Sequence, residues 1–117
     1  MILVVGSIYQ GREAYAYRTF GENIRIFRDL DSLVRDGLSD GLAEDTIVRM
    51  AIDTALLCQV VIACDSYGGL TPIDATERRF VEIYGRILQE LAALADRVDR
   101  VVCGLGQVIK PAKNEGQ

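Results

Sequence analysis

The chain has 117 residues, which is enough for one domain with a buried core and short for a complete nucleotide-dependent transferase. Its 17 acidic and 13 basic residues give a net charge of -4 and form no basic stripe, so nucleic acid is not an expected partner. Histidine is absent, which excludes every mechanism that needs an imidazole as base, metal ligand or covalent intermediate.

The overall pattern predicts one α/β domain over residues 1–110, followed by a polar tail over residues 111–117. No apolar run approaches the roughly 18 residues of a membrane span, and MILVV is too short for the apolar part of a signal peptide. We therefore expect a cytoplasmic protein with no membrane partner. Cys58, Cys64 and Cys103 lie in apolar runs, where cysteine is expected to be a small buried hydrophobe rather than a nucleophile or metal ligand.

The first third of the chain alternates between strand and helix signals. Ile2 to Val5 is an apolar run typical of a strand buried on both faces. A short helix is predicted from Glu13 to about Phe20, and a second strand from Asn23 to Phe27. The stretch LDSLVRDGL then predicts one or two helical turns before Gly37.

The middle of the chain predicts a helix that leads directly into a strand. Ser39 or Asp40 is expected to cap a helix beginning near Leu42, because apolar residues repeat at helical spacing beyond it. The continuous apolar run from Val60 to Cys64 then predicts a central strand.

The clearest element is a helix from about Asp74 to Ala95, with Asp74 and Glu77 as a capping pair at its start. Arg100 to Cys103 predicts a further strand. We expect the three apolar strands to be parallel neighbours in one sheet, with helices on its faces, in a small three-layer α/β fold.

The stretch GSIYQGRE has the glycine spacing of a phosphate-binding P-loop, GxxxxGK[ST]. Gly6, Ser7 and Gly11 are candidates for a backbone cradle around a phosphate group. Arg12 replaces the lysine but keeps its positive charge. Glu13 replaces the hydroxyl residue, which removes a magnesium ligand and places a carboxylate where it opposes an anion at a helix N-terminus. The alternative is a plain strand-to-helix turn with two solvated charges.

The stretch CDSYGGLTP follows a predicted strand at its carboxyl end, where open α/β sheets place their ligands. Asp65 is a candidate base or metal-water anchor, and its alternative role is to cap the following turn. Gly69 belongs to the same stretch. Arg78, near the start of the long helix, is a candidate contact for an anionic ligand, although charged helix residues usually form a solvated face.

These stretches keep their order in a known family. The opening MILVVG and the segment from VVIACDSYGGLTP to GLGQVIK resemble the bifunctional adenosylcobinamide kinase and adenosylcobinamide-phosphate guanylyltransferase of cobalamin biosynthesis. The matching positions on the long helix and at the carboxyl end are Arg78, Phe80, Gly85, Gln89, Leu91, Ala92, Ala95, Asp96, Gly104, Ile109 and Lys110. The resemblance covers roughly half of the chain. It implies a P-loop NTPase fold of the RecA-like type, binding of GTP or ATP or of a corrinoid, and a homo-oligomer.

The departures from the family pattern limit the activity that the resemblance implies. The guanylylated histidine has no counterpart, so guanylyl transfer through it is excluded. The family's lysine and serine are Arg12 and Glu13, so kinase activity and a magnesium requirement are not carried over. Two hypotheses follow, a reduced P-loop protein that binds nucleotide or corrinoid, and a noncatalytic assembly or regulatory subunit. A third is an enzyme acting on another substrate with Asp65 as base.

Overall fold

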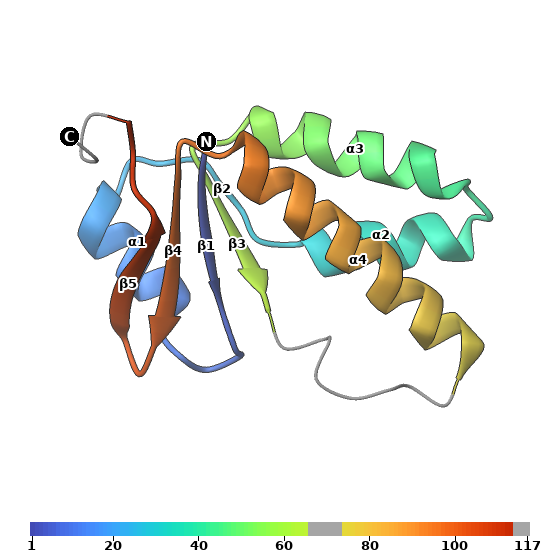
Figure 1. The fold of residues 1–117 in the computed structure, drawn as a ribbon, viewed down its shortest axis with the longest axis horizontal. Helices are drawn as coiled ribbons and strands as arrows, with labels where there is room; N and C mark the ends of the chain where they lie inside the picture. The colour runs from blue at the N-terminus through green and yellow to red at the C-terminus, as the bar shows by residue number, and fades with distance from the viewer. Residues whose placement is uncertain (66–73, 114–117) are drawn as a thin grey trace.

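The computed structural model describes residues 1–65 and 74–113, which form a five-stranded sheet with helices on both faces (Figure 1). The strands are β1 (Ile2–Gly6), β2 (Ile26–Phe27), β3 (Val60–Cys64), β4 (Arg97–Val102) and β5 (Leu105–Lys110), in the spatial order β2-β3-β1-β4-β5. The first four run parallel to one another, and β5 is antiparallel to β4.

The three predicted core strands are confirmed as parallel neighbours. Ile2 of β1 lies opposite Val60 of β3 on one side and Arg97 of β4 on the other. β4 therefore begins three residues before the predicted Arg100. The predicted strand from Asn23 to Phe27 is wrong in extent, because only its last two residues pair with β3.

The helices divide into two layers around the sheet, which confirms the predicted three-layer α/β arrangement. α1 (Arg12–Phe20) covers one face, and α2 (Leu30–Ser39), α3 (Glu44–Leu56) and α4 (Ala75–Leu94) cover the other (Figure 1). Each face has its own apolar core. The larger core lies between the sheet and the three helices, where side chains such as Phe80, Ile83 and Ile87 of α4 are fully buried.

Two helix boundaries differ from the prediction. α2 continues through Gly37 instead of stopping before it, because a glycine there lets the helix pack against Ile47 of α3; a Cβ atom would lie 2.8 Å from Ile47 Cγ1. Neither Ser39 nor Asp40 caps the next helix. They form the end of α2, and α3 begins after Ala43 without a side-chain cap.

The long helix follows its prediction closely. Asp74 is the N-cap of α4 and accepts a hydrogen bond from the Thr76 N–H at 2.6 Å. Glu77 does not complete the predicted capping pair. Its carboxylate accepts a hydrogen bond from Arg35 of α2 at 2.6 Å, so this charge ties two helices together. Within the described residues, no helix is long and apolar enough to cross a membrane.

The sequence did not predict β5, which pairs with β4 as a hairpin. Cys103 and Gly104 connect the strands with φ values of 53° and 76°, the conformation of a two-residue type I′ turn. The expectation that Cys103 is buried is wrong, because this turn exposes it. Cys64 is buried as expected, and Cys58 is partly buried.

Candidate functional site

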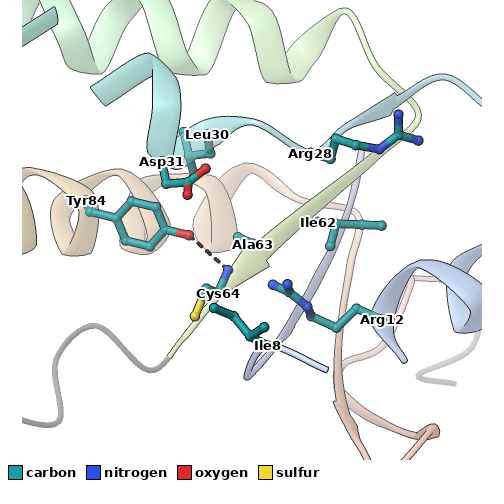
Figure 2. A pocket seen from close by; sticks show the side chains of 9 residues that line it. All are labelled: Ile8, Arg12, Arg28, Leu30, Asp31, Ile62, Ala63, Cys64 and Tyr84. Carbon is teal, nitrogen blue, oxygen red and sulfur yellow. Dashed lines mark hydrogen bonds between the residues drawn. The ribbon is translucent and has the colours of Figure 1, made fainter. Parts of the chain in front are cut away.

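A cavity of about 140 Å³ lies where β1 and β3 end, between the loop before α1 and the start of α2 (Figure 2). Its lining combines apolar side chains with two arginines, a carboxylate and a phenol. The lining residues are Ile8, Arg12, Arg28, Leu30, Asp31, Ile62, Ala63, Cys64 and Tyr84. The predicted ligand crevice at the carboxyl ends of the strands therefore has a physical counterpart.

The loop before α1 is held in place by the β4–β5 hairpin. The side chain of Gln10 accepts a hydrogen bond from the Cys103 N–H at 2.8 Å, and its backbone carbonyl accepts one from the Gly104 N–H at 2.7 Å. Gly11 follows with a φ of 83°, a conformation that favours glycine. The positive φ explains why position 11 is a glycine. The hydrogen bonds from the hairpin fix the loop through residues that do not line the cavity.

Arg12 is the first residue of α1, and its side chain extends into the cavity (Figure 2). Its aliphatic part passes over Gly6, where a Cβ atom would lie 3.3 Å from Arg12 Cγ and Cδ and 2.6 Å from the Val101 carbonyl oxygen. The close approach of β4 therefore requires glycine at position 6, and the Arg12 side chain packs over it. Within residues 1–65 and 74–113, the Arg12 guanidinium has no hydrogen-bond or ion-pair partner.

Glu13 does not face the cavity. Its carboxylate lies 2.7 Å from Arg28 Nη2, and the same nitrogen donates a hydrogen bond to the Tyr17 hydroxyl at 3.1 Å. Figure 2 shows the Arg28 guanidinium directed away from Arg12. Because both charged groups are about half exposed, the pair adds little stability, but it compensates the Glu13 charge next to the loop.

The opposite wall of the cavity is formed by β3, α2 and α4. The Cys64 N–H donates a hydrogen bond to the Tyr84 hydroxyl at 2.9 Å, which fixes the phenol at the end of β3 (Figure 2). Asp31 lies in the first turn of α2 and brings a carboxylate to the same wall. The cavity therefore has a cationic side at Arg12 and an acidic side at Asp31.

Three of the other predicted site residues do not line this cavity. The Asp65 carboxylate accepts a hydrogen bond from Arg100 Nε at 3.1 Å, so an arginine of β4 holds one of its oxygens. Arg78 lies exposed in the first turn of α4 and does not line the cavity. Ser7 is half-buried beside the cavity without lining it, and Gly69 lies outside the described residues.

Sequence reasoning missed Arg28 and Asp31 as site residues. Arg28 comes directly after the short strand β2, and Asp31 follows in the first turn of α2, in the stretch FRDLD. The rule that parallel strands bring their carboxyl ends to one edge would have pointed to them, had this strand been taken as part of the same sheet. Tyr84 lies on the buried face of α4, where helical spacing indicates a core residue and gives no sign that its hydroxyl reaches the cavity.

No protein-family model matches this sequence, and no curated protein matches it. The resemblance to the adenosylcobinamide kinase family therefore stays a prediction.

Proposed function

We propose that the chain binds a phosphate-bearing small molecule, a nucleotide or a phosphorylated corrinoid, with its phosphate group at Arg12. The observation that carries this proposal is the guanidinium of Arg12, which lines a cavity and has no partner within the described residues. An arginine in such a place has its donors available for a phosphate oxygen. The amino end of α1, where Arg12 lies, favours the same charge.

The volume of the cavity limits what enters it. Pockets for whole ligands measure about 300–1,000 Å³, and this cavity of about 140 Å³ holds only a group of the size of one phosphate with its water. The base, sugar or corrinoid ring of the ligand would therefore lie outside. Selectivity among phosphate-bearing ligands would come from surfaces beyond the cavity.

Glu13 weakens this binding less than its position in the motif suggests. The Glu13 carboxylate does not line the cavity, and its ion pair with Arg28 at 2.7 Å offsets its charge. The missing hydroxyl ligand for magnesium remains the larger loss. We therefore propose weak binding of ATP or GTP that depends little on magnesium.

Thermal-shift screening against ATP, GTP and cobinamide phosphate, each with and without magnesium, tests this proposal. Isothermal titration then compares the unmodified chain with Arg12→Gln and with the control Arg49→Gln, which removes the same charge from an exposed position on α3. Loss of one charge-assisted contact is expected to raise Kd about 10-fold or more. The control should change it by less than about 2-fold, because charges on distant surfaces are screened.

Equal binding by the unmodified and Arg12→Gln chains would contradict the proposal. No stabilisation by any of the three ligands at millimolar concentration would favour the alternative, a noncatalytic assembly subunit. One observation supports that alternative by itself: the outer edge of β5 pairs with no strand in the part of the chain that the structure describes.

A further inference from the structure

β5 forms an edge of the sheet, and within the described residues β4 is the only strand that pairs with it (Figure 1). Its first five residues are all exposed. Among them Leu105 is 75% exposed, Ile109 57% and Val108 42%. A six-residue strand thus presents an open row of backbone groups together with three exposed aliphatic side chains.

The two edges of this sheet differ in how they are protected. Proteins usually guard an edge strand by making it very short or by placing charges or proline in it. β2 is only two residues long, and the exposed residues Arg25 and Arg28 flank it. The run LGQVI of β5 contains no charge and no proline, and the irregularity in its pairing with β4 comes only after Val108.

The hairpin turn determines which backbone groups of β5 point outward. In the type I′ turn at Cys103 and Gly104, the N–H of Leu105 faces Val102, the residue before the turn, and is therefore directed toward β4. Backbone groups alternate sides along a strand, and the pairing is regular from Leu105 to Val108. The N–H and C=O groups of Gly106 and Val108 therefore face away from β4.

We propose that β5 pairs antiparallel with β5 of a second copy of this chain, about a two-fold axis at Gln107. Gly106 then lies opposite the partner's Val108, which brings the outward-facing groups of both strands together. Leu105 comes opposite the partner's Ile109, so two of the three exposed aliphatic side chains cover one another.

The strand that pairs with β5 comes from a second copy of the chain because the sequence of β5 is complementary to itself in this register. Gln107 lies opposite the partner's Gln107, where the two amides can hydrogen-bond. Lys110, the one charge in β5, follows the uncharged run, and its Nζ donates to the Ala92 and Ala93 carbonyl oxygens of its own chain at 3.0 Å, so its charge is directed at the end of α4. Such a contact is isologous and closes at two copies. It does not depend on ligand binding at Arg12, so failure of either proposal leaves the other standing.

Sedimentation of the full chain over a concentration series tests the dimer. Leu105→Lys and Ile109→Glu should each raise the dimer Kd about 10-fold or more. Each occurs in both copies, so it removes both aliphatic contacts of the symmetric pair and places a charge against an aliphatic side chain in each. A mixture of the two variants should recover dimer, because the register sets the new ammonium opposite the new carboxylate. A chain that stays monomeric at millimolar concentration would overturn the proposal, and so would a dimer that neither variant weakens.

Cross-linking tests the register with milder substitutions. Opposite residues whose backbone groups point away from each other have Cα atoms about 4.5 Å apart, within the roughly 4.4–6.8 Å range of a disulfide. In a Cys103→Ser background, Gln107→Cys should therefore form a disulfide-linked dimer on mild oxidation, whereas Leu105→Cys should form much less. Equal cross-linking at both positions, or none at Gln107, would refute this pairing. Melting temperatures equal to that of the unmodified chain would show that neither result comes from unfolding of the variants.

Discussion

Replacing Tyr15 by phenylalanine tests how strongly the buried carboxylate of Asp99 depends on its hydrogen bond from the Tyr15 hydroxyl. Asp99 of β4 is 0% exposed, and its carboxylate accepts hydrogen bonds from the Tyr15 hydroxyl at 2.5 Å and from Arg97 Nε at 2.9 Å. Tyr15→Phe keeps the ring and removes one donor to a buried charge. A hydrogen bond to a charged group contributes about 1.5–3 kcal/mol, so the free energy of unfolding should fall by about that amount.

Urea denaturation and calorimetry measure this change. At roughly 4 °C per kcal/mol for a chain of this size, the melting temperature should fall by about 6–12 °C. The matched control is Tyr17→Phe on the same helix, which removes a hydroxyl that accepts an exposed bond from Arg28 and should cost less than about 0.5 kcal/mol. Equal losses in the two variants would refute the argument that the buried carboxylate depends on Tyr15.

The same contact predicts a pH dependence. Burial raises the pKa of Tyr15 above its ordinary value of 10.0, and the hydrogen bond to Asp99 and its negative charge raise it further. Because the folded state prefers the protonated phenol, this stabilisation is present below pH 10.0 and is lost as the pH rises through the folded-state pKa. Tyr15→Phe should therefore remove part of the alkaline loss of stability seen in the unmodified chain.

Three further predictions concern the loop before α1 and the chemistry it permits. Glu13→Ser should tighten ATP or GTP binding more than Arg12→Lys does, because it frees Arg28 and restores a hydroxyl; titration showing the reverse order would contradict this. Gly6→Ala should lower the free energy of unfolding by about 1–3 kcal/mol, because its Cβ would lie 2.6 Å from a β4 carbonyl oxygen. The control Gly85→Ala, on α4 with open space around it, should stabilise by about 0.5–1 kcal/mol. Labelled GTP should leave the protein without covalent GMP, since the chain has no histidine, and stable labelling of any residue would overturn this.

The parts of the fold that the sequence predicted are those with one dominant physical signal. The three apolar strands and α4 are buried on one or both faces, so their hydrophobic period alone identifies them. β5 escaped prediction because its first five residues are exposed and show no alternation between buried and exposed positions. The turn at Cys103 was not predicted either, because a cysteine after two valines is typical of a buried strand and does not indicate a positive φ.

The candidate site was predictable only where the chain carries a motif. Arg12 stands at a defined position of a glycine-spaced loop, and the structure places it in a cavity. The partner of Glu13 was not predictable, because Arg28 lies fifteen residues away and reaches it only through the packing of α1 against the sheet. The pairing of Asp65 with Arg100 was likewise not predictable, because it joins the end of β3 to β4 across β1, which lies between them.

NMR titration of the ¹⁵N-labelled chain with ATP tests the proposed role of Arg12 most directly, because it reports where the ligand lies as well as whether it binds. We expect the largest changes at the side-chain Nε of Arg12 and at the backbone amides of residues 7–13, with much smaller changes in the same protein carrying Arg12→Gln. Changes confined to other surfaces, or no change at millimolar ATP, would contradict phosphate binding at this cavity.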